Sequence, residues 1–293
     1  MLKVCVPATS ANLGPGFDTL GIALELMNTF YFCLDEEDIP PKGAKFMSAN
    51  SLVQRGAELV AEETGGKLPK WQVALNAQIP SSRGLGSSAS LTVAGIVAAN
   101  HYLQAGLSSE KLLELACRLE GHPDNAAPAL LGGLVVSTVT PEGVKFLKTL
   151  PGETLKTVVA VPEFTLPTNQ AREVLPTQVS YHDAIQNTGR TALFVSSMLL
   201  GDYTHLKYAM EDVLHQPYRM DLVPGFKEVM AAAIKSGALG SCLSGAGPSI
   251  LAFITEKAEE VRHSMTKTWV EFGIKSKAYL LEINRTGVQC QEI

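Results

Sequence analysis

The 293-residue sequence predicts an α+β fold in two domains. Segments with the two-residue alternation of strands and segments with helical periodicity follow one another in mixed order. No internal repeat is visible, and the pattern restarts between residues 140 and 155. We therefore expect one domain over residues 1–152 and a second over residues 153–293, with a cleft between them.

The first domain should open with a short strand. Residues 2–6 are apolar except for Lys3, and Pro7 should stop the strand because proline lacks a backbone N–H. The next nine residues, 8–16, are rich in glycine, which indicates a loop. Helical periodicity over residues 52–64 ends at two glycines, a common helix stop. The other strands of this domain are expected at residues 22–26, 29–34, 71–75 and 134–138.

Further helices are expected in this domain. Residues 86–104 are nearly uncharged and rich in small apolar residues, which is typical of a buried helix. Ser108 or Ser109 can cap the next helix, and Gly121 should end it. A short helix over residues 126–131 should precede a pair of glycines.

The second domain has the same mixture of elements. A strand is expected at residues 155–161, and Thr168 can cap a segment that runs to Leu175. The other helices are expected at residues 181–200, 203–214, 226–236 and 258–272. The other strands are expected at residues 250–254 and 278–283. Strands and helices thus occur in mixed order in both halves of the chain, as in an α+β protein.

The composition excludes several classes of protein. Hydrophobic residues make up 46% of the chain and charged residues 18%, with a net charge of -5, so we expect a globular protein. The absence of a Lys/Arg cluster argues against nucleic-acid binding. We expect neither a signal peptide nor a membrane span. The five scattered cysteines argue against a disulfide framework or a zinc site, which favours the cytoplasm.

A glycine- and serine-rich loop between a predicted strand and a predicted helix is the strongest functional signal. Gly84 and Gly86 let the backbone approach a polyanion, and a helix N-terminus offers free N–H groups to phosphate. Ser87 and Ser88 add hydroxyl groups. The loop lacks the lysine of a P-loop and the third glycine of a dinucleotide fingerprint. A turn that merely begins a helix is the alternative.

The loop sequence Pro-Ser-Ser-Arg-Gly-Leu-Gly-Ser-Ser-Ala resembles the ATP-binding signature of GHMP kinases, a family of small-molecule kinases. In that family the loop wraps the phosphates of the nucleotide. The resemblance therefore implies ATP binding by Pro80, Ser81, Ser82, Arg83, Gly84, Leu85, Gly86, Ser87, Ser88, Ala89 and Ser90.

Two further motifs stand in the order that GHMP kinases show. Pro-Ala-Thr-Ser-Ala-Asn-Leu-Gly-Pro-Gly-Phe-Asp, residues 7–18, resembles the homoserine kinases in particular. The resemblance implies that Asn12 and Asp18 contact an amino-acid substrate, whose ammonium group needs an anionic partner. Leu-Ser-Gly-Ala-Gly-Pro-Ser, near the end of the chain, resembles the C-terminal glycine motif and implies backbone contacts from Gly245 and Gly247. Local turns and a helix cap are the alternatives.

A segment with two acidic residues can supply a metal ligand. Glu-Gly-His-Pro-Asp-Asn, which begins at Glu120, resembles a homoserine kinase segment that precedes Ala-Pro and Gly-Gly. The resemblance implies that Glu120 and Ser88 bind Mg²⁺ and that Asn125 contacts the substrate. Many members of the family have a longer insertion here, so the chain departs from the pattern. A base role for Asp124 stays open, and His122 beside a proline is expected to be structural.

Two arginines are candidates for binding a substrate carboxylate, because the planar guanidinium fork matches two oxygens. The segments Thr-Asn-Gln-Ala-Arg, ending at Arg172, and Gln-Pro-Tyr-Arg, ending at Arg219, both resemble homoserine kinases. The resemblance implies that these arginines form a carboxylate clamp with Thr168 nearby. Surface arginines on amphipathic helices are the alternative.

The resemblance runs from residue 6 to about residue 254. It implies the two-domain GHMP kinase fold, with a ribosomal protein S5 domain 2-like N-terminal domain and a ferredoxin-like C-terminal domain. It implies ATP- and Mg²⁺-dependent phosphorylation of L-homoserine to O-phospho-L-homoserine, a step towards threonine, and a homodimer. Discrimination against serine and feedback by threonine stay open.

Two rival functions are weighed against this expectation. Another GHMP kinase, acting on a sugar, mevalonate or shikimate, should lack the clamp of Asp18, Arg172 and Arg219. A non-catalytic GHMP-fold protein should have a damaged phosphate loop or lack the metal-binding acid, and this chain has both features.

Overall fold

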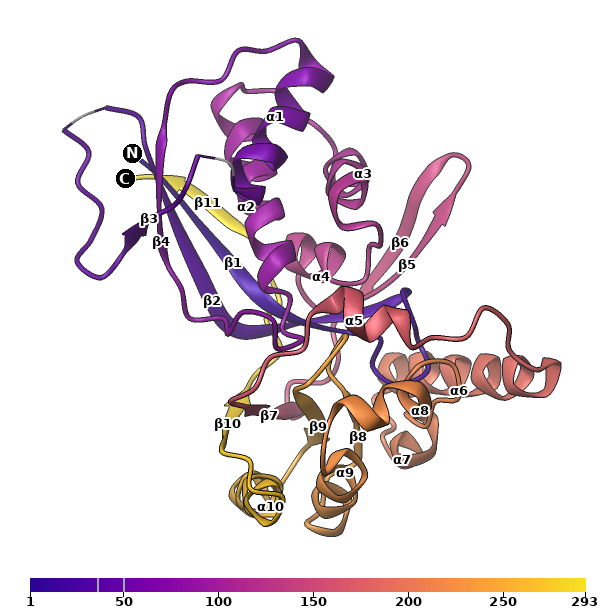
Figure 1. Cartoon of the computed structure of the whole chain (residues 1–293). Helices are drawn as coiled ribbons and strands as arrows, with labels where there is room; N and C mark the ends of the chain where they lie inside the picture. Colours follow the sequence, from indigo (N-terminus) through magenta and orange to yellow (C-terminus); the bar gives the residue numbers. More distant parts are fainter. Residues whose placement is uncertain (36, 50) are drawn as a thin grey trace.

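The computed structural model describes residues 1–35, 37–49 and 51–293. Within these residues the chain forms two β-sheets with helices packed against them, which confirms the predicted α+β fold (Figure 1). No helix in the described part of the chain combines the length and the apolar character needed to cross a bilayer.

The larger sheet contains both ends of the chain. Its strands, all paired antiparallel, are β1 (Leu2–Ala11), β2 (Leu20–Cys33), β3 (Lys45–Phe46), β4 (Gln72–Asn76), β5 (Leu134–Thr140), β6 (Gly143–Thr149) and β11 (Gln289–Glu292). The long strand β2 pairs with β1 along most of its length, and with β5 and β4 along its two halves. Sequence analysis did not predict β3, β6 or β11.

Strand β1 corrects two predictions. It passes through Pro7 instead of ending there, so residues 8–11 are strand and not loop. The pairing with β2 shifts register between Pro7 and Ala8, and such an irregularity tolerates a residue without an N–H. The strands predicted at residues 22–26 and 29–34 are likewise one strand, β2.

Helices cover one face of this sheet: α1 (Leu52–Thr64), α2 (Ser87–Tyr102), α3 (Ser109–Glu120) and α4 (Ala126–Leu131) (Figure 1). Helices α1 and α2 approach closely at Gly95, where a Cβ would lie 1.9 Å from the Val53 carbonyl oxygen. Phe30 and Phe32 of β2 join Ile96 of α2 in the buried core. This packing fixes α2, and therefore the position of its N-terminus.

The smaller sheet has the spatial order β10 (Ser276–Leu281), β7 (Lys156–Pro162), β9 (Ile250–Ile254) and β8 (Gly240–Leu243). Helices α9 (Phe226–Lys235) and α10 (Ala258–Glu271) pack against it around the buried Trp269. The chain order βαββαβ with this strand order is the ferredoxin-like arrangement, as predicted. Sequence analysis missed β8.

The segment between β7 and α9 carries α5 (Thr168–Glu173), α6 (Tyr181–Leu200), α7 (Leu206–Ala209), α8 (Gln216–Arg219) and the 3-10 helix η1 (Met220–Leu222). The predicted helix over residues 203–214 is wrong except for α7. The Asp212 carboxylate accepts hydrogen bonds from the N–H groups of Leu214, His215 and Gln216, so it stabilises a turn there.

A second apolar core joins the two sheets. Ile22 and Leu24 of β2 pack in one cluster with Val159 of β7, Leu251 of β9 and Phe194 of α6.

The division of the chain into domains at residues 1–152 and 153–293 stays a prediction. Strand β11 crosses it, because the end of the chain pairs with β1.

Candidate active site

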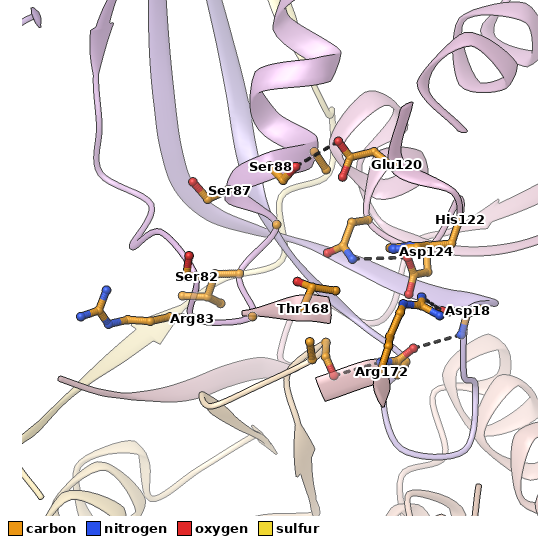
Figure 2. Close-up of a pocket in the computed structure, with 18 of the residues that line it drawn as sticks. Asp18, Ser82, Arg83, Ser87, Ser88, Glu120, His122, Asp124, Thr168 and Arg172 are labelled. Atoms are coloured by element: carbon orange, nitrogen blue, oxygen red, sulfur yellow. Dashed lines mark hydrogen bonds and ion pairs between the residues drawn. The ribbon is translucent and has the colours of Figure 1, made fainter. Parts of the chain in front are cut away.

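A cavity of about 440 Å³ collects most of the predicted site residues, and its size suits a small-molecule ligand (Figure 2). Its lining includes Asn12, Asp18, Ser81, Ser82, Arg83, Gly84, Leu85, Gly86, Ser87, Ser88, Ala89, Glu120, Asn125, Thr168, Arg172, Arg219 and Gly245. Pro80, Ser90 and Gly247 lie outside the lining. The structure thus brings the predicted residues together, and their individual roles stay predictions.

The three predicted motifs contact one another through hydrogen bonds to backbone carbonyl oxygens. The Ser244 hydroxyl donates to the Gly84 carbonyl oxygen at 2.6 Å, and the Gly245 N–H donates to the Ala11 carbonyl oxygen at 3.1 Å. A Cβ on Gly84 would lie 2.1 Å from the Ser244 carbonyl oxygen, so only glycine fits there. The C-terminal glycine motif therefore supports the phosphate loop directly.

The phosphate loop ends at the N-terminus of α2. Gly86 has a left-handed conformation, with φ of 67°, and a Cβ there would lie 1.9 Å from Thr9 Oγ1. Within the described residues no side chain caps this helix, so its first N–H groups are available to an anion. Ser87 and Ser88 stand at the same end (Figure 2).

Two residues of the predicted loop make bonds within the protein. Arg83 donates to the Pro162 carbonyl oxygen through Nε at 3.0 Å and to the Glu163 carbonyl oxygen through Nη2 at 2.6 Å. These bonds tie the loop to the end of β7. The buried Ser90 hydroxyl accepts from Asn28 Nδ2 at 2.9 Å, so it holds the helix start against β2.

Glu120 lies at the end of α3, next to the N-terminus of α2. Its Oε1 accepts from Ser88 Oγ at 3.1 Å and from Thr92 Oγ1 at 2.6 Å. A carboxylate and a hydroxyl beside a helix end that can bind phosphate are oxygen ligands that suit Mg²⁺. The missing family insertion therefore does not separate Glu120 from Ser88. The residues present fit the metal that the sequence resemblance implies.

The predicted amino-acid clamp forms another side of the cavity (Figure 2). Arg172 binds Asp18 through two bonds, Nη2 to Oδ1 at 2.6 Å and Nη1 to Oδ2 at 3.1 Å. Arg219 is only 1% exposed, and its Nε donates to the Ala171 carbonyl oxygen at 2.9 Å. Burial and the nearby Arg172 lower the pKa of Arg219 to about 10. Two cations in one corner suit an incoming carboxylate.

Asn12 and Asn125 shape the site through bonds to its own loops. Asn12 is buried, its Nδ2 donates to the Gly245 carbonyl oxygen at 3.0 Å, and its Oδ1 accepts from the Asp18 N–H at 3.0 Å. Asn125 Oδ1 accepts from Thr9 Oγ1 at 2.8 Å. Both amides therefore connect different motifs while they line the cavity.

The chain matches two known family descriptions and many curated relatives. Residues 51–133 match "GHMP kinases N terminal domain", and residues 194–271 match "GHMP kinases C terminal". The homoserine kinase of Desulfitobacterium hafniense is 42% identical, with 98% of this chain and 99% of the relative covered. That of Carboxydothermus hydrogenoformans is 41% identical over 94% of this chain and 92% of the relative. The chain belongs to the homoserine kinase group of the GHMP kinases.

A solved structure gives the same relationship. The crystal structure of homoserine kinase from Cytophaga hutchinsonii has a TM-score of 0.84 and 29% identity, with 99% of this chain and 97% of that one covered. The family and the two-domain GHMP kinase fold predicted from the motifs are confirmed.

In this GHMP kinase the cavity also contains residues that sequence analysis did not assign to the site. The Phe17 ring lies 5.5 Å from the Arg172 guanidinium and 5.3 Å from that of Arg219. His122, expected to be structural, contacts the buried Asp124 carboxylate through Nδ1. Both residues belong to recognised motifs, but a lone aromatic ring or imidazole gives no signal of its contacts.

The His122 ring lies among acids in the same cavity. Burial alone would lower the pKa of His122, but the hydrogen bond and charge of Asp124 outweigh it and raise the pKa. Ligand atoms of His122, Asp124 and Asp18 all lie within 4.8 Å of one another. The ring therefore connects the Glu120 segment to the amino-acid clamp.

Proposed function

We propose that the protein is a homoserine kinase, which transfers the γ-phosphoryl group of ATP to the hydroxyl of L-homoserine. The products are ADP and O-phospho-L-homoserine, on the way to threonine. One observation carries the proposal: the uncapped N-terminus of α2 and the Asp18, Arg172 and Arg219 group line a single cavity. The curated homoserine kinases at 41% and 42% identity support the same function.

The phosphates of ATP would lie against the N-terminus of α2. The loop from Ser81 to Ala89 lines the cavity there, and its shape depends on Gly84 and Gly86. Glu120 and Ser88 would hold Mg²⁺ with the nucleotide. When bound, Mg²⁺ neutralises charge on the phosphate oxygens that take part in transfer.

The amino acid would lie against the clamp. Arg219 and Arg172 would bind its carboxylate, and Asp18 would bind its ammonium group. Asp18 and Arg172 already pair with each other, so the substrate must share or replace two existing hydrogen bonds. Asn125 and Thr168 also line the cavity, and the reacting hydroxyl would lie between the clamp and the phosphate loop.

We also infer a cytoplasmic homodimer, in which the second copy covers α6. One face of this helix carries large exposed apolar side chains, with Tyr181 84%, Ile185 58% and Leu200 80% exposed. Aspartate, glutamate, lysine and arginine are absent from the exposed positions of this helix. Light scattering should give twice the mass of the chain, and Ile185→Glu should halve it; a monomeric wild-type protein would contradict the inference.

The deciding experiment measures ADP release with Mg-ATP and one alcohol at a time: homoserine, serine, mevalonate, galactose and shikimate. Stimulation by homoserine alone is expected. If another alcohol stimulated ADP release, the kinase activity would stand and homoserine would be rejected as the substrate. If none of the five alcohols stimulated ADP release, both the kinase activity and the substrate would be rejected. A Glu120→Gln protein purified in parallel measures any contaminating activity.

A further inference from the structure

His215 is a buried histidine that no motif singled out. It lies directly before α8, and its side chain has no exposed surface. Its Nε2 is 2.8 Å from the Gly14 carbonyl oxygen, and its Nδ1 is 3.1 Å from Arg219 Nη1. A carbonyl oxygen can only accept and a guanidinium can only donate. The two partners therefore require a neutral ring with its proton on Nε2.

The ring also contacts the other side of the substrate site. It stacks on Phe17 with 5.1 Å between ring centroids and 24° between planes. Phe17 in turn faces the Arg219 guanidinium at 5.3 Å. Asp212 fixes the backbone of the turn, because its Oδ2 accepts from the N–H groups of His215 at 2.9 Å and Gln216 at 2.7 Å. The imidazole thus connects the loop that carries Asp18 to the buried arginine.

We propose that His215 is a positioning residue of the substrate site, whose neutral imidazole holds the Arg219 guanidinium and whose protonation weakens homoserine binding. The proposal rests on the proposed function, in which Arg219 binds the substrate carboxylate. A proton on Nδ1 would remove the ring lone pair that accepts from Arg219 Nη1. It would also place a second positive charge beside the guanidinium.

The surrounding charges set the pH range of this effect. Burial lowers the pKa of His215; the Asp212 carboxylate opposes this, and Arg219 adds to it. The negative charge of Asp18 also favours the charged form of the ring. The other titratable groups on this side are Arg172, which lies beyond Phe17, and the Cys242 thiol, which lies near Asp212. The net direction is downward, so the ring is neutral at pH 7. Homoserine binding should weaken only in acid, below the ordinary histidine pKa of about 6.5.

Nuclear magnetic resonance of the wild-type protein with labelled histidine tests the tautomer without a substitution. One histidine should show the neutral Nε2–H form at pH 7 and titrate below the ordinary histidine pKa of about 6.5. Its signals are assigned in the wild-type protein through nuclear Overhauser contacts with the stacked Phe17 ring. An Nδ1–H tautomer, or titration in the ordinary range, would overturn the proposal while leaving the homoserine kinase function in place.

Kinetics of His215→Ala and His215→Asn test the role. At pH 7.5 the alanine variant should raise the homoserine KM at least about tenfold and leave the ATP KM unchanged, because Arg219 loses a charge-assisted bond. The asparagine Oδ1 can replace Nδ1 as acceptor, so this variant should stay within about threefold of the wild type and lose the rise in homoserine KM in acid. His263→Asn, at an exposed position of α10, is the matched control and should behave as the wild type.

The outcomes separate the two proposals. The positioning role would be overturned if the KM values for homoserine and ATP rose equally. It would also be overturned if the homoserine KM of His215→Asn still rose in acid as it does in the wild type. A wild-type protein that ignores homoserine would overturn the function and the substrate role together, and the measured tautomer would still report the ring's bonds. If the variants do not fold, the tautomer and the titration of His215 in the wild-type protein decide whether the proposal stands.

Discussion

At the scale of single residues, the proposed substrate site contains charges in different states of pairing. Asp18 and Arg172 are paired and about one third exposed, whereas Arg219 is buried against carbonyl oxygens and His215. Because this ion pair keeps part of its surface in solvent, a substrate can exchange with it at a lower cost than with a fully buried pair. A buried guanidinium without a carboxylate partner gains much more from an incoming carboxylate.

Arg219→Leu should therefore raise the homoserine KM by about tenfold to hundredfold, the value of a charge-assisted hydrogen bond. The ATP KM should change by less than about threefold. Steady-state kinetics with each substrate varied in turn provide the measurement. Arg118→Leu on the exposed part of α3 is the control, and similar increases in both KM values would contradict the clamp.

Glu120 is the residue on which metal binding should depend. Glu120→Gln keeps the size of the side chain and removes the charge, so kcat/KM should fall about a hundredfold or more. The Mg²⁺ concentration needed for half-maximal rate should rise. Glu114→Gln, on the same helix but paired with Arg118 at the surface, should leave both quantities unchanged. An active Glu120→Gln enzyme with normal Mg²⁺ dependence would exclude Glu120 as a ligand.

At the scale of elements, the site depends on contacts between loops and the ends of helices. The phosphate loop follows β4, the Asp18 loop follows β1, and the loop of Gly245 follows β8. Backbone bonds tie the other two loops to β1, which continues into the Asp18 loop: the Thr9 N–H donates to the Leu85 carbonyl oxygen at 3.2 Å, and the Gly245 N–H donates to the Ala11 carbonyl oxygen. A change in one loop should therefore disturb the others.

Gly84→Ala tests this coupling between loops. The new Cβ would meet the Ser244 carbonyl oxygen in a left-handed conformation, so we expect a loss of about 2 kcal/mol or more in the free energy of unfolding. ATP binding, measured by calorimetry, should fall with it. Gly65→Ala is a matched control, because its φ of 67° is similar and nothing lies within 4 Å. It should cost about 1 kcal/mol and leave ATP binding intact.

At the scale of the whole molecule, the cavity is lined by residues from both predicted domains, so it depends on their fixed relation. The shared core of β2, β7, β9 and α6 provides one connection. The end of the chain provides another, because β11 leaves the ferredoxin-like half and pairs with β1 from Leu2 to Cys5. Leu24 and Ile283 form an additional bridge between the halves.

Removal of residues 289–293 tests this second connection. The truncation deletes β11 and exposes the edge of β1, so we expect Tm to fall by about 4 °C or more and aggregation to increase. Differential scanning calorimetry provides the measurement. Removal of Ile293 alone, which is 54% exposed and follows β11, is the control. An unchanged Tm in the longer truncation would show that the shared core is sufficient.

Much of the fold could be predicted because its signals are local. Helices α1, α4 and α6 begin and end at the predicted residues, since their periodicity, caps and glycine stops lie within a few neighbouring positions. The phosphate loop was predicted for the same reason. Its glycines and serines are adjacent in the chain, and they contact the same part of one cavity.

Only the tertiary structure decided the features that depend on distant partners. Pro7 stays in a strand because β2 shifts register beside it, and residues 203–214 are mostly not helical because the Asp212 side chain binds the backbone N–H groups that follow. The state of His215 follows from Gly14 and Arg219, which no pattern around residue 215 reveals. Sequence by itself determined the local elements and the motifs. Tertiary packing decided which charges pair, which rings stack and which strand edges are covered, because those contacts join residues far apart in the chain.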